Sequence, residues 1–301
     1  MNKTHDITVA IPTYNRDKEL LDTINDVLKQ SHRNLELLII DQTADHSAYT
    51  KQKINNINDP RFRYVLADPP SLPAARNFAL KNARAPIILF LDDDVAVDKD
   101  LVKFHLMAFK EHPDVSAVGG RVLQKGFPIQ KEVLKFNEFA ISHGVFTATE
   151  PAYTNAFPGG NCSLNVKEAL SLGGFDTRFY GSAFREESDM SLKMTRAGMK
   201  IFYEPRAVLT HLASHSGGTR TAKYTDLYDT KLFYRNEFFF TIRATKTRDL
   251  LPAIARKYLM YCRGFGYKTN LRRSWYFGLG VLGAFWRMVF GQQIITRERD
   301  S

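Results

Sequence analysis

The 301-residue sequence predicts an α/β fold in which a mostly parallel sheet is flanked by helices and followed by a helical C-terminal region. Two observations lead to this prediction. Short apolar segments alternate with amphipathic segments over the first two thirds of the chain, which is typical of buried parallel strands joined by helices. The last quarter instead becomes rich in aromatic residues, arginine and lysine.

Four segments in the first hundred residues have the pattern of buried strands. They are short and mainly apolar, and most of them run into proline or polar residues. These segments lie at residues 7–12, 35–47 (where the strand passes into a polar loop), 61–68 and 86–94. Helical spacing of apolar residues predicts helices between them at residues 16–30 and 72–83.

The next hundred residues are less regular. We expect helices at 98–113, 165–175 and 186–198, strands at 115–123 and 200–212, and a flexible loop at 214–221. Residues 124–158 show no clear period, and we expect a partly extended region over a binding cleft.

Charge is distributed very unevenly along the chain. Residues 1–218 contain 26 basic and 26 acidic side chains, whereas residues 219–301 contain 16 basic and 6 acidic ones. The uncharged stretch at 274–286 is too short to span a bilayer, which needs about 20 residues. Since Arg272, Arg273 and Arg287 flank it, we expect this region to lie in a membrane interface.

Cysteine usage and the first residues bear on the compartment. Two cysteines, Cys162 and Cys262, do not form a disulfide framework, and the start of the chain has no pattern of a secretory signal. We therefore expect reduced thiols in a cytoplasmic protein.

Polar side chains follow three of the predicted strands, in "PTYNR", "DQTAD" and "DDD". Ligands of doubly wound sheets bind at the carboxyl ends of strands. Carboxylates bind phosphate only through a hard cation, and no glycine-rich phosphate loop follows any strand. The pattern therefore indicates a nucleotide whose diphosphate is held through Mg²⁺ or Mn²⁺.

Seven motifs occur in an order that resembles the inverting family 2 glycosyltransferases of GT-A fold. They are "VAIPTYNR", "IIDQTAD", "PAARNFAL", "LFLDDD", "PGGNCSLNV", "GGFDTRF" and "EESDMSLKMTRAG", and the resemblance covers roughly residues 6–220. It implies a GT-A domain at residues 1–220, followed by a basic, aromatic-rich helical region at residues 221–301 that associates with the membrane.

The resemblance implies a set of donor-binding residues at the strand ends. Asp41 would hydrogen-bond the base, although a turn or helix-capping role is an alternative. Gln42 stands beside it where the family more often has a second aspartate. For Arg76 and Asn77 the alternative is a place on a helix surface. The full donor set is Pro12, Thr13, Tyr14, Arg16, Asp41, Arg76, Asn77, Asp92, Asp93 and Arg220.

The triple aspartate corresponds to the family's D-x-D motif. Asp94 would ligate the cation between the two phosphates, Asp92 would lie towards the ribose and also contact the metal, and Asp93 would be a spacer or second donor contact. The alternative is a solvated turn that caps a helix. His211 would add a further metal contact, with His215 as the alternative, and Arg220 would offset leaving-group charge.

Two further motifs would form the acceptor side. In "REESDMSL" Glu186 takes the first acidic place, Glu187 that of the catalytic base, and Asp189 would steady the segment or touch the acceptor. Acids at a helix start also favour the helix dipole, which is the alternative. Gly159, Gly160 and Asn161 would line the acceptor side, unless they form a simple turn.

The sequence therefore predicts an inverting glycosyltransferase that uses Mn²⁺ or Mg²⁺ and a nucleotide-sugar, with UDP-sugars favoured. Its acceptor would be a saccharide or polyprenol-linked hydroxyl in surface polysaccharide or glycolipid synthesis, at the cytoplasmic face of the inner membrane, and nucleic acid is not expected. The alternatives are a sugar nucleotidyltransferase, a non-catalytic nucleic-acid-binding protein with a basic tail, and an inactive transferase-like module.

Overall fold

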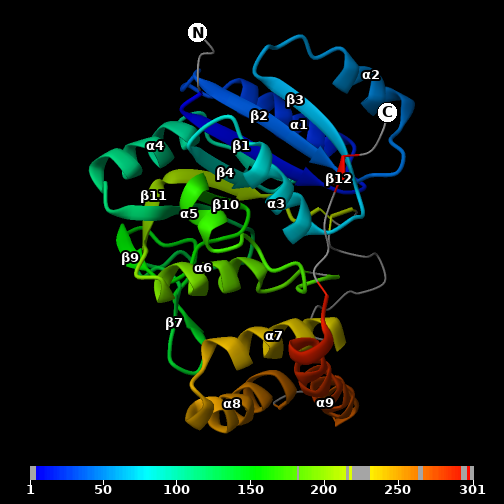
Figure 1. Cartoon of the computed structure of the whole chain (residues 1–301), viewed down its shortest axis with the longest axis vertical. Coiled ribbons are helices and arrows are strands. Elements are labelled where there is room, and N and C mark those ends of the chain that lie inside the picture. Colours follow the sequence, from blue (N-terminus) through cyan, green and yellow to red (C-terminus); the bar gives the residue numbers. More distant parts are fainter. Residues whose placement is uncertain are drawn as a thin grey trace.

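The computed structural model describes residues 5–181, 183–214, 217–218, 231–263, 267–292 and 297–298. A large twisted sheet forms one end of the molecule, and three C-terminal helices form the other (Figure 1). The strands of the sheet are β1 (Ile7–Thr13), β2 (Leu35–Asp41), β3 (Phe62–Asp68), β4 (Ile87–Leu91), β5 (Val95–Val97), β6 (Val115–Leu123), β9 (Ala152–Thr154), β10 (Asn161–Asn165), β11 (Lys200–His211) and β12 (Arg297–Glu298).

The sheet is mixed but mainly parallel where its long strands meet. Its order is β12-β3-β2-β1-β4-β10-β6-β11-β5, and β9 pairs with β11. The pairs β1–β2, β2–β3, β1–β4 and β6–β11 are parallel, whereas β10 is antiparallel to both β4 and β6. The predicted α/β fold with a mostly parallel sheet is therefore confirmed.

Helices cover both faces of the sheet. Apolar residues of β1 alternate between two clusters: Ile7, Val9 and Ile11 pack in one, and Ala10 packs in the other. The first cluster includes side chains of α1 (Lys18–Leu28), α2 (Ala48–Asn55) and α4 (Leu101–Glu111). The second includes side chains of α3 (Leu72–Asn82), α5 (Val166–Ser171) and α6 (Glu186–Arg196).

Some elements differ from those that the sequence pattern predicts. The helix α2 and the strands β5 and β10 were not expected, because they are short or polar. The segment 124–158 contains only the short strands β7 (Lys135–Phe136), β8 (Ser142–His143) and β9, which fits the absence of a clear period.

The C-terminal helices are α7 (Lys231–Ala244), α8 (Leu250–Cys262) and α9 (Tyr267–Phe290), and a short 3-10 helix, η2 (Thr247–Asp249), precedes α8. Their aromatic side chains form a separate apolar cluster, which also takes in Phe179 and Ala140 from the preceding part of the chain. The helix α6 lies between the sheet and α7 (Figure 1). Among the described residues no helix is both long and apolar enough to cross a bilayer.

Candidate active site

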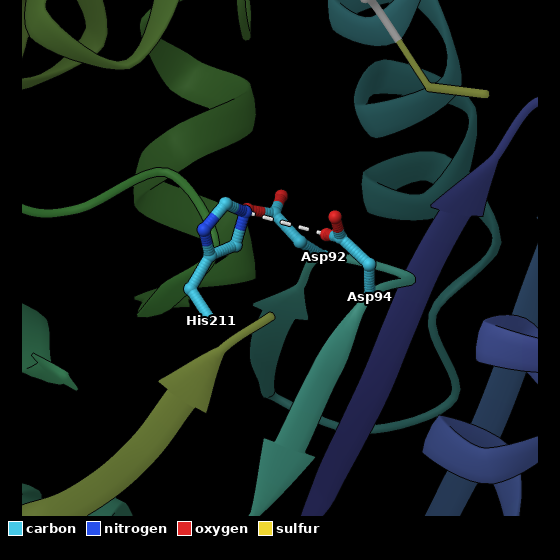
Figure 2. A group of neighbouring side chains, drawn as sticks. All are labelled: Asp92, Asp94 and His211. Carbon is cyan, nitrogen blue, oxygen red and sulfur yellow. Dashed lines mark ion pairs between the residues drawn. The ribbon is translucent and has the colours of Figure 1, made fainter. Parts of the chain in front are cut away.

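Two distant segments bring a candidate metal site together at one edge of the sheet. Asp92, Asp93 and Asp94 follow β4 directly, and the antiparallel pairing of β5 with β11 sets His211 opposite Val95. One ligand atom each from Asp92, Asp94 and His211 lies within 4.8 Å of the others (Figure 2). These are three of the residues that the sequence singled out.

Asp94 is nearly buried and has three polar contacts. Its Oδ2 accepts hydrogen bonds from Arg16 Nη2 and from the backbone N–H of Ser214, both at 3.0 Å, and its Oδ1 lies 3.3 Å from His211 Nε2. Burial opposes ionisation, but His211, Arg16 and the Ser214 amide together hold the pKa of Asp94 below its usual value. Asp94 is therefore an anion at neutral pH.

The donor set fits a hard divalent cation. Two carboxylates and one imidazole are ligands that Mn²⁺ accepts readily, and Mg²⁺ also takes carboxylates. His211 Nδ1 lies 3.1 Å from Gln124 Oε1, which can only accept a hydrogen bond, so the proton belongs on Nδ1. This contact orients the ring and leaves Nε2 directed at Asp94, as is usual for metal-binding histidines.

Asp93 contacts β1 and the loop that follows it. Thr13 Oγ1 donates to its Oδ2 at 2.7 Å, and Arg16 Nε lies 3.3 Å from its Oδ1. Burial, together with the neighbouring aspartates, raises the pKa of Asp93 to about 7 against the effects of Arg16 and Thr13. These contacts tie the aspartate loop to β1, which agrees with the expected role of a spacer, and a contact of Asp93 with the donor stays a prediction.

The loop after β1 supplies the next part of the site. Pro12 and Thr13 are buried in the strand, Tyr14 is 37% exposed, and Arg16 is 4% exposed. The backbone N–H of Gly218 donates to the carbonyl of Tyr14 at 2.7 Å, so this glycine lies against the loop. The predicted residues Arg220 and His215 lie outside the described part of the chain.

Asp41 is fully buried at the end of β2. His46 Nε2 and the hydroxyl of Tyr64 each lie 2.5 Å from its Oδ2, and the backbone N–H of Thr43 donates to Oδ1. His46 Nδ1 lies 2.7 Å from Asp17 Oδ1. The bond to Asp41 raises the pKa of His46, which lies between two carboxylates. The sequence analysis missed His46, which lies five residues past a strand end.

Gln42 has a structural role that explains its place beside Asp41. Its amide nitrogen donates to the carbonyl of Pro69 at 2.9 Å, and its Oε1 accepts from the backbone N–H of Ser71 at 3.0 Å. A carboxylate could not donate the first of these bonds. The glutamine thus joins the end of β2 to the loop that precedes α3.

Arg76 connects the metal cluster with the acidic helix α6. It is 2% exposed, and its guanidinium lies beside the rings of Phe90 and Phe175, at 5.6 and 5.4 Å from their centroids. It pairs with Glu186, donates to the carbonyl of Gly159 at 2.9 Å, and lies 4.0 Å from Asp92 Oδ1. A surface position for Arg76 is thereby excluded.

Asn77 and Asn161 both use their side-chain amides in hydrogen bonds within the protein. Asn77 uses both ends of its amide on the backbone of Phe175, with bonds of 2.8 and 2.7 Å. Asn161 is fully buried: its Oδ1 lies 2.8 Å from His105 Nε2, and its Nδ2 donates to the carbonyls of Arg121 and Ala207. These amides hold loops and strands together, and their contacts with donor and acceptor stay predictions.

The two glycines before Asn161 are required by their neighbours. A Cβ on Gly160 would lie 2.1 Å from Asp92 Oδ2, and one on Gly159 would lie 3.1 Å from the terminal nitrogens of Arg76. Both glycines therefore allow the "PGG" turn to lie directly against the side chains of the site.

The first turn of α6 carries three acidic residues with different surroundings. Glu186 is 1% exposed and pairs with Arg76, and burial raises its pKa to about 8 despite this partner. Glu187 is partly exposed, and its Cβ lies 3.4 Å from the Cβ position of Gly159. Asp189 is fully buried and pairs with Arg243 Nε of α7 at 2.7 Å, which favours its expected steadying role over a contact with the acceptor.

Comparison with known proteins identifies the family. Residues 8–172 match the family described as "Glycosyl transferase family 2", which is more than half of the chain. The chain belongs to this family. Glycosyl transfer is therefore its family's activity, and the predictions of family and of GT-A fold are confirmed.

Relatives with curated names match parts of the chain. A "Poly-beta-1,6-N-acetyl-D-glucosamine synthase" of Staphylococcus aureus is 28% identical over 218 residues, which cover 70% of this chain and 51% of that protein. An "Uncharacterized glycosyltransferase" of Rickettsia felis is 38% identical over 108 residues, or 35% of this chain and 17% of that protein. The chain thus spans about half or less of the length of these relatives.

Solved structures share the fold. The crystal structure of GalNAc-T7 with UDP, GalNAc and Mn²⁺ has a TM-score of 0.61 at 14% identity and covers 96% of this chain and 58% of that one. The mannosyltransferase PcManGT from Pyrobaculum calidifontis, in complex with GDP-Man and Mn²⁺, has a TM-score of 0.59 at 17% identity and covers 97% and 89%. At these identities the likeness establishes the fold.

Proposed function

We propose that this protein is an inverting, metal-dependent glycosyltransferase that moves a sugar from a nucleotide-sugar to a hydroxyl group. The observation that supports this proposal most strongly is the meeting of Asp92, Asp94 and His211 at the carboxyl end of β4, beside a partly exposed glutamate on α6. The named relatives and the two solved neighbours are transferases or synthases of sugars, which agrees with this assignment.

Asp92, Asp94 and His211 would hold the cation. Bound Mn²⁺ or Mg²⁺ would offset the negative charge of the departing nucleoside diphosphate. Arg16 is placed to take part in diphosphate binding, because its guanidinium lies against Asp94 and its Nη1 is buried without a hydrogen-bond partner among the described residues. The loop of Tyr14 and the buried Asp41 would shape the pocket for the nucleoside.

Glu187 is the residue that we assign as general base. The acceptor hydroxyl must lose its proton during attack on the anomeric carbon, and a base has to reach that proton directly. Glu186 is 1% exposed and is occupied by Arg76, whereas Glu187 is partly exposed next to Gly159. Glu186 therefore serves to hold Arg76 in the buried part of the site. Gly159 and Gly160 would border the acceptor.

Replacing each glutamate by glutamine tests this assignment. We expect Glu187→Gln to lower the rate of sugar transfer about 100-fold or more, since a general base contributes 10²–10⁴-fold, while donor affinity stays unchanged. Glu186→Gln should instead lower the melting temperature, because it weakens the buried contact between residue 186 and Arg76. Near-normal turnover by Glu187→Gln would reject it as the base.

The donor is proposed to be a UDP-sugar. The solved neighbours include complexes with UDP and with GDP-Man, so the base has to be decided by binding. We would measure thermal stabilisation and slow hydrolysis of UDP-GlcNAc, UDP-galactose and GDP-mannose with Mn²⁺, because a ligand that binds the folded state raises its apparent stability. Absence of stabilisation and hydrolysis with every nucleotide-sugar would contradict the proposed function.

The acceptor is proposed to be a saccharide or polyprenol-linked hydroxyl used in surface polysaccharide or glycolipid synthesis. The staphylococcal relative is named as the synthase of a polysaccharide, which supports this class of product.

We also propose the division of the chain into a GT-A domain at residues 1–220 and a helical region at 221–301. The two cysteines of the protein, Cys162 and Cys262, are both free and buried. This agrees with the proposed location in the reducing cytoplasm.

The face of α9 supports association with a membrane surface. It exposes a stripe of apolar side chains, and the helix has no acidic residue but carries exposed Lys268 and Arg272. Exposed apolar and basic residues on one helix favour an interface with anionic lipid. The other two arginines do not contribute, since Arg273 and Arg287 are 5% and 2% exposed. The stripe consists of Leu271, Trp275, Leu279, Leu282, Phe285, Trp286, Val289 and Phe290.

Vesicle sedimentation tests this surface. Wild-type protein should sediment with vesicles that contain phosphatidylserine and less with neutral phosphatidylcholine vesicles. The double variant Trp275→Ser, Trp286→Ser should lose this binding without a loss of folding, because both rings are more than 60% exposed. Concentration-dependent dimers that bind no vesicles would instead assign the stripe to contact between two copies of the chain.

A further inference from the structure

The start of the acidic helix α6 has an unusual backbone conformation. Arg185, the residue before Glu186, has φ of +75°, in the left-handed region that side chains other than glycine rarely adopt. No side chain caps the helix at this point. Such a conformation persists only where tertiary contacts hold it, and here it comes two residues before the proposed base.

The side chain of Arg185 is held by α7. Its Nε lies 2.7 Å from Oε2 of Glu237, and its guanidinium packs against the rings of Phe184, Phe136 and Phe240, at 4.6, 5.0 and 5.6 Å from their centroids. Arg185 is 9% exposed and Glu237 is fully buried. A charged pair of this kind has a defined geometry, because no water competes for its hydrogen bonds.

Glu237 also has a second cationic partner, which matters for the experiment. Lys257 of α8 pairs with Oε1 of Glu237, and its Nζ donates to the carbonyl of Ala140 at 2.8 Å. Burial disfavours the charged carboxylate, yet Arg185 and Lys257 together hold the pKa of Glu237 below its usual value. Arg185 connects Glu237 to the start of α6, whereas Lys257 connects it to α8 and to the carbonyl of Ala140.

A second contact between the same two helices lies one turn further along. Arg243 of α7 pairs with Asp189 of α6 at 2.7 Å and with Asp176 at 3.0 Å. The helix α7 therefore contacts α6 on both sides of Glu187, at residues 185 and 189. All of these residues lie outside the segment 8–172 that matches the family.

We propose that Arg185, held by Glu237, is a positioning residue that sets the start of α6 and thereby directs Glu187 toward the acceptor. The C-terminal helices are then part of the catalytic apparatus as well as a candidate membrane contact. This inference rests on the proposed function only in taking Glu187 as the base. The structural part of the inference, that Arg185 orders the first turn of α6, does not depend on which residue is the base.

Two substitutions in the same buried group separate positioning from stability. Arg185→Met leaves Glu237 paired with Lys257, and Lys257→Met leaves Glu237 paired with Arg185. In each variant the buried carboxylate therefore keeps one cationic partner. With UDP-GlcNAc or whichever other nucleotide-sugar the wild-type protein hydrolyses with Mn²⁺, we expect Arg185→Met to lower kcat at least tenfold with KM changed less than twofold. Lys257→Met should change kcat less than twofold, and Arg185→Lys should recover part of the loss.

Hydrogen exchange gives a readout that does not depend on activity. In the full-length protein, backbone amides in residues 186–190 should exchange at least tenfold faster in Arg185→Met than in the wild type, and should be unchanged in Lys257→Met. Unchanged exchange in Arg185→Met would overturn the structural part. Equal losses of kcat in both variants would show a general effect of stability and overturn the positioning role.

A wild-type protein that hydrolyses no nucleotide-sugar would reject the proposed function, and the exchange experiment would still decide whether Arg185 orders α6.

Discussion

Asp94 and Glu237 are both carboxylates that lie almost entirely out of contact with water, but the balance of charged groups around them is opposite. Glu237 lies among aromatic side chains between two cations, Arg185 and Lys257. At the end of β4, by contrast, Asp92, Asp93, Asp94 and Glu186 share two arginines, Arg16 and Arg76. Cations are in excess in the C-terminal group, and carboxyl groups are in excess in the group at the sheet edge.

This difference separates a structural ion group from a candidate site. A buried carboxylate with two cations needs nothing further, whereas an excess of carboxyl groups raises their pKa values or calls for an external cation. Burial and neighbouring carboxylates raise the pKa of Asp93 to about 7 and that of Glu186 to about 8. The edge of the sheet therefore favours an additional positive charge, whereas the carboxylate of the C-terminal group already has two cationic partners.

The largest effect on folding should come from the C-terminal group. Glu237→Gln leaves two buried cations without an anion, and breaking a buried ion pair in this way costs about 3–5 kcal/mol. We expect the free energy of unfolding, measured in urea, to fall by about that amount. The exposed Glu150→Gln is the control and should change it by less than about 0.5 kcal/mol. A small effect of Glu237→Gln would remove the contrast between the two groups.

At the sheet edge the large effect should be on activity. Asp94→Asn keeps a hydrogen-bond acceptor for Arg16 but loses the charge that would bind the cation. We expect Mn²⁺-dependent hydrolysis of the nucleotide-sugar to fall at least about 100-fold, since metal-ion catalysis contributes several kcal/mol and each 1.36 kcal/mol is a factor of ten. Far-UV circular dichroism would check folding. Full turnover of this variant in EDTA would contradict the metal role.

A smaller effect should follow from displacing Asp92 without changing it. Gly160→Ala introduces a methyl group at a position 2.1 Å from Asp92 Oδ2, so the carboxylate has to move. We expect the Mn²⁺ concentration for half-maximal activity to rise about tenfold, as for other changes next to metal ligands. The control is Gly278→Ala, where a Cβ meets no atom within 4 Å. Equal metal dependence in both variants would place the cation elsewhere.

The smallest effect should come from His46, whose stabilisation depends on pH. Its pKa is raised, mainly by Asp41, so its contribution is complete below the unfolded pKa of about 6.5 and disappears as the pH rises through the folded pKa. We expect His46→Gln to lower the free energy of unfolding by roughly 1 kcal/mol at pH 5.5 and by less at pH 9. An identical loss at both pH values would show that the histidine is uncharged in the folded protein.

The amino-acid sequence alone predicts the sheet and several residues of the candidate site. The apolar segments at β1, β2 and β4 could only be buried strands, and polar residues directly after a strand have to lie at its carboxyl end. Asp92 and Asp94 could be singled out for this reason, since chain neighbours stay together in any fold. The end of a strand likewise placed His211.

The partners of the buried polar side chains follow from the packing of distant segments and could not be predicted from the sequence. Asp93, Asn77 and Asn161 belong to the same motifs as their neighbours, but their partners lie 40 to 98 residues away in the chain, on other strands and loops. The same holds for Arg185 and Glu237, which are 52 residues apart. Local pattern predicts burial and secondary structure, whereas the pairing of buried charges depends on the packing of segments that the pattern does not connect.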